Sequence, residues 1–229
     1  MIKQSIKDIN SYCNLVDLYL EADHIDRHEG KQAFVKYHSM LNDISKKYNS
    51  NFNATVAAFC ALSPSSDYLG NLRSLVSVLE GLNNGLTPEK IKTSSYNHCK
   101  ERAISYLTGG EFVTEKRGLK ILNFYFNIIE PGNPSYVTID GHMVAAFLGD
   151  ESMTMKQAKI SRSEYSHIVL YVKLLAKKID ILPNQLQAIL WFTRKRLYRI
   201  KYQPNFDLFN DKDDNWGITV DVDAIKPYR

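Results

Sequence analysis

Residues 32–48 read QAFVKYHSMLNDISKKY, a stretch in which apolar side chains return every three or four positions. The same spacing runs through residues 12–22, YCNLVDLYLEA. This period is typical of amphipathic helices, which turn one face to a core, whereas half-buried strands alternate at every second residue. Strand signals are scarce elsewhere in the chain, so the sequence predicts an all-α fold of roughly ten helices.

Capping and breaking residues set the bounds of the other helices. The nearly all-apolar segment 53–62 predicts a buried helix that ends near Ser63-Pro64, because the residue before a proline disfavours helical geometry. Asp67 and the serines before it offer N-caps for a helix to about Leu82. We expect a helical turn at 87–92, helices at 97–107, 119–130, 161–179 and 183–201, a hairpin at 114–118, and a short helix at 141–149 after an extended segment at 137–140.

Composition excludes several classes of protein. The 229 residues are 44% hydrophobic and 24% charged, which indicates a packed core rather than a disordered, collagen-like or coiled-coil chain. No stretch is long and apolar enough to span a membrane, and the first residues lack the apolar core of a signal peptide. We therefore expect a cytoplasmic protein, of a bacterium or a phage-infected cell, without a membrane partner.

The three cysteines lack paired spacing, which argues against a disulfide framework, a four-cysteine zinc site and an iron–sulfur cluster. We expect no metal, no other cofactor and no obligate protein partner. No repeat or low-complexity linker marks a domain boundary, so the prediction is one helical unit over residues 1–229, either one compact body or two helical lobes with a cleft. Helices within 1–50 and 160–202 pack with the central part, and residues 203–229 form a surface tail.

The basic residues are not spread evenly along the chain. The net charge of +4 permits a nucleic-acid partner without demanding one. A basic stripe with interleaved aromatic rings attracts a phosphate backbone. For the last long helix taken alone, we favour the alternative, in which its cations only complement the helix dipole and solvate its C-terminal end. The stripe at the end of the last long helix consists of Trp191, Arg194, Lys195, Arg196, Tyr198, Arg199, Lys201 and Tyr202.

Asp140 is the most informative carboxylate in the sequence. It follows an apolar extended triplet and precedes Gly141 and His142 at the start of an apolar helix. Backbone geometry fixes a side chain at such a position and can half-bury it, which suits acid–base or electrostatic chemistry. Taken by itself, the simpler role is favoured, namely a helix N-cap, for which aspartate is among the best residues.

Four segments share their order and approximate spacing with one enzyme family. Gly118-Leu119-Lys120 falls on the G-R-K of the family's hairpin, and Ile139-Asp140-Gly141-His142 falls on a V-D-T-H segment further on. Upstream, residues 60–64 (CALSP) with Asn71 resemble an L-L-S-A-Q segment with its downstream asparagine, and Tyr96-Asn97 with Lys100 and Ala103 resembles a Y-N-x-K-A helix. Over about residues 53–150 the chain thus resembles the helix-hairpin-helix DNA glycosylase superfamily, which includes the endonuclease III-like enzymes.

A group of glycosylase-like proteins from phage genomes is more similar still. These proteins share the A-L-S-P and T-I-D-x-H segments, and an L-Q-A-I-x-W segment that lies at residues 186–191 here. The hairpin departs from the family's pattern, because Glu115 and Lys116 replace its proline and its first glycine. Side chains would then substitute for backbone amides in holding a phosphate.

The resemblance implies an enzyme that flips a modified or damaged base out of DNA and cleaves its N-glycosidic bond. Asp140 would be the catalytic carboxylate that stabilises positive charge on the sugar. Lys120 falls where bifunctional members carry the Schiff-base lysine of an AP-lyase, with an exposed phosphate-contacting lysine as an equal alternative. Lys116, Arg117, Gly118, Arg194 and Arg196 would hold the DNA backbone.

The resemblance also suggests residues that contact the base. Asn71, Tyr96, His142, Gln187 and Trp191 are the candidates, and Tyr68 and Phe124 are further candidates for stacking. Each polar candidate has a structural alternative: His142 satisfied by a backbone carbonyl, and Asn71 or Gln187 bridging helices inside the core.

Two other functions stay open at this point. Some phage relatives of the superfamily are implicated in building hypermodified thymines, so the same fold would remodel a thymine-derived base without excising it. A catalytically inactive DNA-binding protein is the non-enzymatic alternative. Excision, remodelling and binding alone differ in their products, which separates them by experiment.

Overall fold

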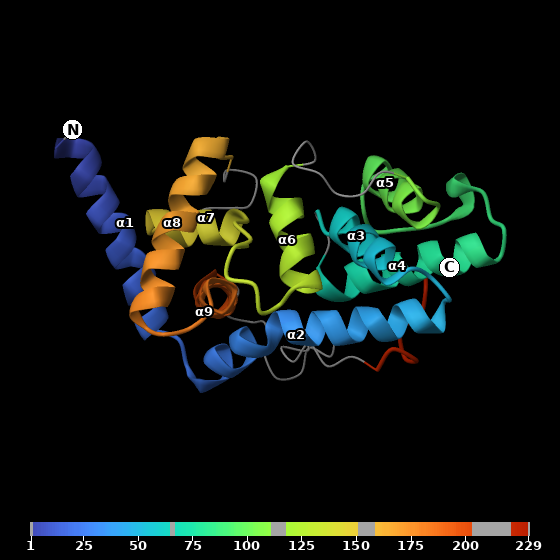
Figure 1. Ribbon diagram of the computed structural model, residues 1–229, viewed down its shortest axis with the longest axis horizontal. Coiled ribbons are helices and arrows are strands. Elements are labelled where there is room, and N and C mark those ends of the chain that lie inside the picture. Colours follow the sequence, from blue (N-terminus) through green and yellow to red (C-terminus); the bar gives the residue numbers. More distant parts are fainter. Residues whose placement is uncertain (1, 65–66, 111–117, 151–158, 203–220, 229) are drawn as a thin grey trace. The chain divides into compact units, whose positions relative to one another are not determined.

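The computed structural model describes residues 2–64, 67–110, 118–150, 159–202 and 221–228 (Figure 1). Over these residues the chain is all-helical and has no strand, which confirms the all-α prediction with roughly ten helices. The predicted hairpin at 114–118 lies outside the described residues except for Gly118. The elements are α1 (Ile2–Leu20), α2 (His24–Lys47), α3 (Phe52–Leu62), α4 (Tyr68–Asn83), the 3-10 helix η1 (Pro88–Lys90), α5 (Asn97–Leu107), α6 (Leu119–Ile129), α7 (Gly141–Leu148), α8 (Arg162–Lys178) and α9 (Pro183–Tyr202).

The start of α2 differs from the sequence prediction, and a capping box explains the difference. The helix begins at His24 rather than at residue 32, and α1 begins at Ile2 rather than at residue 12. The backbone N–H of Asp26 donates to Oδ1 of Asp23 at 2.8 Å, and the N–H of Asp23 donates back to Oδ2 of Asp26 at 3.3 Å. This reciprocal pair is a capping box with aspartate at both positions, so it nucleates the helix one turn after α1 ends.

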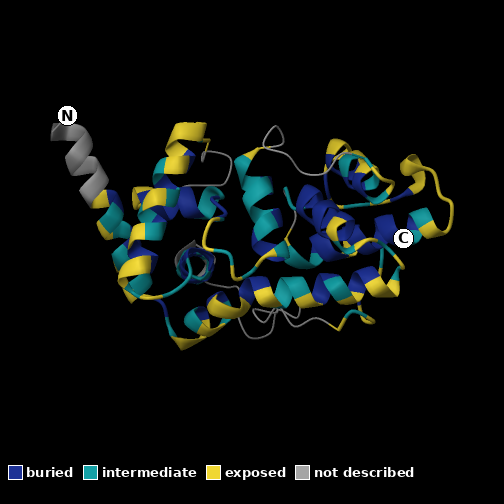
Figure 2. Ribbon diagram, in the orientation of Figure 1, coloured by how far each residue is buried: buried dark blue, intermediate teal, exposed yellow. Residues whose placement is uncertain are grey.

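The chain forms two compact units, and each takes residues from two parts of the sequence. Unit 1 contains α1, the part of α2 up to Phe34, and α7 to α9. Unit 2 contains the rest of α2 from Val35, α3 to α6, and the C-terminal residues 221–228. Each unit has buried residues of its own (Figure 2), and most of them are apolar.

In unit 1, α9 packs against α1, α7 and α8. Its side chains Leu186, Ile189 and Leu190 are completely buried, and burying a side chain of this kind stabilises a fold by about 1.5–3 kcal/mol. The first part of α2 approaches α9 very closely, because a Cβ on Gly30 would lie 2.6 Å from the backbone nitrogen of Ile189. Only glycine permits this crossing.

In unit 2, α3 is buried over residues 54–62 and packs against α4, α5 and α6. The end of the predicted surface tail is anchored to this unit. Ile225 is buried, the N–H of Tyr228 donates to Oγ of Ser77 at 2.6 Å, and Lys47 Nζ contacts Asp223 Oδ1 at 2.8 Å. The remainder of that tail, residues 203–220, lies outside the described residues.

Candidate functional site

Asp140 lies at the junction that the sequence predicts, between a buried extended segment and α7. Residues 137–139 are buried, and the hydroxyl of Tyr165 on α8 donates to the carbonyl of Val137 at 2.8 Å while it accepts the N–H of Ile139 at 3.1 Å. Asp140 then caps α7, since its Oδ1 accepts the backbone N–H of Met143 at 3.1 Å. The N-cap role is therefore confirmed.

The second oxygen of the same carboxylate has a partner far away in the sequence. The indole Nε1–H of Trp191 on α9 donates to Oδ2 of Asp140 at 2.8 Å. A carboxylate that accepts two N–H groups from fixed backbone and indole donors is held in one orientation. Asp140 remains part exposed, so its oriented carboxylate belongs to a residue that is not sealed in the interior.

A parallel contact joins the next polar residue of α7 to α9. Nη1 of Arg194 lies 2.8 Å from Nδ1 of His142, and Nη2 donates to the carbonyl of Asp150 at 3.3 Å. Because a guanidinium only donates hydrogen bonds, Nδ1 must accept, and the imidazole proton is assigned to Nε2. Nδ1 of His142 thus contacts a side chain, that of Arg194, whereas the sequence suggested a backbone carbonyl as the partner of this histidine.

Four residues thus form one connected group, which we call the α7–α9 cluster: Asp140, His142, Trp191 and Arg194. The rings of His142 and Trp191 meet edge to face with centroids 5.7 Å apart, and Lys195 Nζ lies 4.4 Å from the centroid of the Trp191 ring. Arg194 is only 6% exposed. The cluster combines an oriented carboxylate with an imidazole whose Nδ1 lies against a guanidinium.

Gln187 lies one helical turn before Trp191 on α9 and is 5% exposed. Its Oε1 is buried and has no hydrogen-bond partner among the described residues. Oε1 of Gln187 therefore does not bridge helices within the part of the chain that the structure describes. Asn184, one turn further back, does bridge elements, because its Nδ2 donates to the carbonyl of Pro131 at 2.8 Å.

Unit 2 holds the other predicted site residues. The buried Asn71 bridges helices as its structural alternative suggested, since its Nδ2 donates to the carbonyl of Phe59 at 3.2 Å. Tyr96 is 56% exposed at the start of α5, and its ring stacks on His98 with centroids 5.6 Å apart. Lys100, the lysine of the Y-N-x-K-A segment, is buried and donates to the carbonyl of Ile91 at 3.0 Å.

The hairpin candidates are described only at their C-terminal end. Gly118 is exposed with φ +100°, a left-handed conformation that favours glycine, and its carbonyl accepts the N–H of Leu122 at 3.2 Å. Lys120 lies part exposed in the first turn of α6. Lys116 and Arg117 lie outside the described residues.

The further stacking candidates contact other aromatic rings. Tyr37 of α2 meets Tyr68 and Phe124 edge-on, with centroids 5.7 and 5.9 Å away, and Phe59 lies 5.7 Å from the same ring. Burial raises the pKa of Tyr68 above its usual range, as it does for Tyr37. These rings pack on one another; Phe59 is buried, whereas Tyr37, Tyr68 and Phe124 are part exposed.

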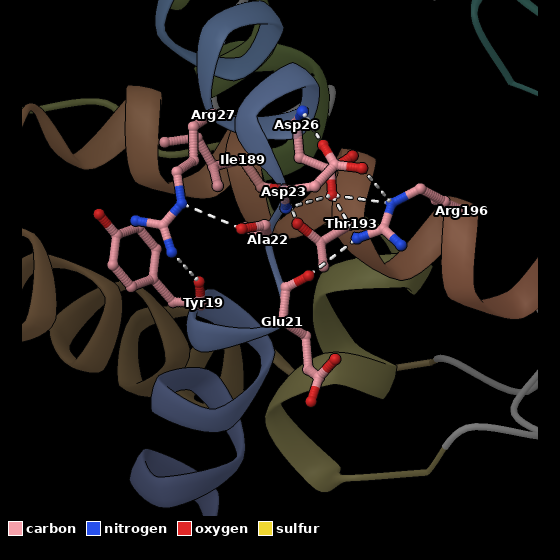
Figure 3. A network of polar contacts seen from close by, with 9 residues as sticks. All are labelled: Tyr19, Glu21, Ala22, Asp23, Asp26, Arg27, Ile189, Thr193 and Arg196. Carbon is pink, nitrogen blue, oxygen red and sulfur yellow. Dashed lines mark hydrogen bonds and ion pairs between the residues drawn. The ribbon is translucent and has the colours of Figure 1, made fainter.

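Arg196, predicted to hold the DNA backbone, binds carboxylates within unit 1 (Figure 3). Its Nη2 lies 2.7 Å from Oδ2 of Asp26 and donates to the carbonyl of Glu21 at 2.8 Å, and its Nε lies 3.3 Å from Oδ2 of Asp23. Burial lowers the pKa of Arg196, but the hydrogen bond and charge of Asp26, with the charge of Asp23, outweigh it and raise the pKa. Arg196 therefore ties α9 to the α1–α2 turn.

Other chemistries find little support among the described residues. No group of three or more His, Cys, Asp or Glu side chains in that part of the chain is arranged to hold a metal ion. Burial raises the pKa of the Cys60 thiol and of the Cys99 thiol, which disfavours the reactive thiolate at both positions. None of the described helices is long and apolar enough to cross a membrane.

A protein-family model described as "Family of unknown function (DUF7178)" matches residues 2–197. The chain belongs to this family. The DUF7178 match includes the α7–α9 cluster and Gln187. No curated protein and no solved structure matches the chain significantly.

Proposed function

We propose that the chain is a DNA glycosylase-like enzyme with a helix-hairpin-helix fold, which flips a modified or damaged base and cleaves its N-glycosidic bond. The observation that carries the proposal is the carboxylate of Asp140, held by Met143 N–H and Trp191 Nε1–H yet part exposed. The order of the four family-like segments, with this aspartate at the start of α7, supports the same assignment.

The chemistry follows from charge. As the bond from C1′ of the sugar to the base nitrogen breaks, its electron pair leaves with the base and positive charge builds on the sugar. The oriented carboxylate of Asp140 stabilises that charge, and it accepts a proton from the water that adds to C1′. The products are a free base, which takes up a proton, and an abasic site.

Two further groups have roles in this proposal. His142, which Arg194 contacts at Nδ1, is the proposed contact to the base beside Asp140. Lys120 is the proposed nucleophile of an AP-lyase step. Its amine adds to the C1′ aldehyde of the abasic site with loss of water, and the resulting Schiff base allows a C2′ proton to be removed and the 3′-phosphate to leave, which cleaves the strand. Gly118 contacts the DNA backbone at the start of α6, together with Lys116 and Arg117.

The test is a product analysis with DNA that carries assorted modified bases, including DNA from phages with hypermodified genomes. The pure protein and its Asp140→Asn variant are incubated with each DNA, and released bases, alkali-sensitive sites and intact nucleosides are measured by mass. Base release by the wild type and not by the variant supports the proposal. Strand breaks that form without alkali, and disappear in a Lys120→Ala variant, support the lyase step.

Two other outcomes would contradict excision. A mass change in an intact nucleoside, without a free base or an abasic site, would instead establish base remodelling. DNA binding that Asp140→Asn leaves unchanged, without any product, would indicate a binding protein that has lost the chemistry.

A further inference from the structure

One face of α9 carries a line of polar and aromatic side chains at alternating steps of three and four residues: Asn184, Gln187, Trp191 and Arg194. Residues at this spacing lie above one another on a helix. Trp191 and Arg194 both bind residues at the start of α7. Gln187 therefore lies on the face of α9 that is turned to the carboxylate of Asp140, one turn before Trp191.

The two amides at the start of this line differ in their partners. Asn184 is completely buried and its Nδ2 donates to the carbonyl of Pro131, although its Oδ1, like Oε1 of Gln187, has no hydrogen-bond partner among the described residues. Gln187 is 95% buried, yet its Oε1 has no hydrogen-bond partner among the described residues. An unpaired carbonyl in a protein interior lowers stability, and the Nδ2 bond of Asn184 offsets that loss. The Gln187 side chain has no such bond among the described residues, so a ligand explains its burial better than packing does.

We propose that Gln187 reads the edge of the flipped base, an inference that rests on the proposed glycosylase function. A primary amide presents a carbonyl acceptor and an N–H donor side by side in one plane. Its complement is a planar ring edge in which an N–H donor lies beside an acceptor, as on the nucleobases. Oε1 accepts the N–H of the base, and Nε2 donates to the neighbouring acceptor.

The first experiment separates this role from a structural one. Gln187→Met keeps the length of the side chain and removes its polar atoms. We expect the melting temperature of Gln187→Met to equal or exceed that of the wild type, because an unpaired carbonyl is lost from the interior. Base release should fall about ten- to hundredfold, the range typical of losing a bidentate contact to a base edge.

Asn184→Leu is the matched control on the same helix face. It removes an amide that is bonded to the carbonyl of Pro131, so it should lower the melting temperature. Base release per folded molecule should stay at the wild-type level. A Gln187→Met variant that loses as much stability as Asn184→Leu, or that releases base as fast as the wild type, would overturn the inference while the glycosylase function stands.

The second experiment does not depend on catalysis. The side-chain NH₂ resonances of Gln187 are assigned in ¹⁵N-labelled protein as those missing from Gln187→Met, and each of the four deoxynucleosides is titrated separately. We expect at least one nucleoside to shift these resonances, and its derivative methylated at the ring N–H or exocyclic amine donor to leave them unchanged. Shifts without base release from any DNA would support Gln187 as a base reader and contradict excision. Resonances that none of the four nucleosides moves would overturn the inference.

Discussion

Two helices of this protein begin with the same capping residue, and among the described residues only one of the two capping carboxylates is also bonded to another helix. Asp67 caps α4 and Asp140 caps α7; each has an extended backbone and accepts the N–H three residues on, at 2.6 and 3.1 Å. Asp140 also accepts the indole N–H of Trp191, which lies 51 residues further along the chain. The bond to Gly70 that orients Asp67 is entirely local.

A good N-cap and a candidate catalytic carboxylate are thus alike in local sequence. What distinguishes Asp140 is the second donor from α9, with Arg194 on the same helix fixing the next polar residue, His142. The start of α2, also in unit 1, likewise depends on α9, because Arg196 binds both aspartates of its capping box. In unit 1, α9 therefore holds the starts of both α2 and α7.

The largest effect on stability is expected from breaking the contact between α9 and α2. Arg196→Met leaves the carboxylate of Asp26, which is 2% exposed, without its cation. The free energy of unfolding should fall by about 3 kcal/mol, the low end of the range for removing one partner of a buried pair. Urea denaturation measures this change.

The matched control is an ion pair of unit 2 on the surface. The side chains of Lys47 and Asp223 are 35% and 86% exposed. Lys47→Met should change the free energy of unfolding by less than about 1 kcal/mol, because water screens such a pair. Equal losses in Arg196→Met and Lys47→Met would contradict the role of α9 in holding the start of α2.

The close crossing of α2 and α9 offers a second way to disturb unit 1. In Gly30→Ala the new methyl group would meet both the backbone and the side chain of Ile189, so one helix must shift. We expect a loss of about 1–3 kcal/mol, as for other overpacked cores. Gly132→Ala, with no atom within 4 Å of the new methyl, should have little effect on the thermal midpoint.

The indole bond can be removed with little change in packing. Trp191→Phe keeps an aromatic ring and loses the N–H that orients Asp140. Stability should fall by about 1 kcal/mol, the usual net value of one hydrogen bond. Because orientation acts on the chemical step, kcat for base release should fall while KM stays near the wild-type value. A change in KM alone would indicate that Trp191 stacks on the base instead of positioning Asp140.

The sequence predicts the helices well from α3 to α9, where caps and breakers are local: the bounds agree within about two residues, and the N-cap roles of Asp67 and Asp140 are confirmed. It misses the start of α2, because an Asp-x-x-Asp capping box is a weaker signal than the apolar period that begins eight residues later.

The site is predictable in its residues and not in its contacts. Trp191 is singled out as a stacking residue, but its N–H partner depends on how α9 packs against α7. Arg196 belongs to a basic stripe in the sequence, yet its carboxylate partner Asp26 lies 170 positions away. Contacts of this range arise from tertiary packing, which local patterns do not encode.

The central claim is that Asp140 does more than cap a helix, and the matched pair Asp140→Asn and Asp67→Asn tests it most directly. Asparagine caps helices as well as aspartate does, so both variants should fold with melting temperatures close to the wild type. Base release from modified DNA should fall about 10²–10³-fold in Asp140→Asn and stay unchanged in Asp67→Asn. If both variants release base at the wild-type rate, Asp140 is an N-cap like Asp67 and the proposed mechanism is wrong.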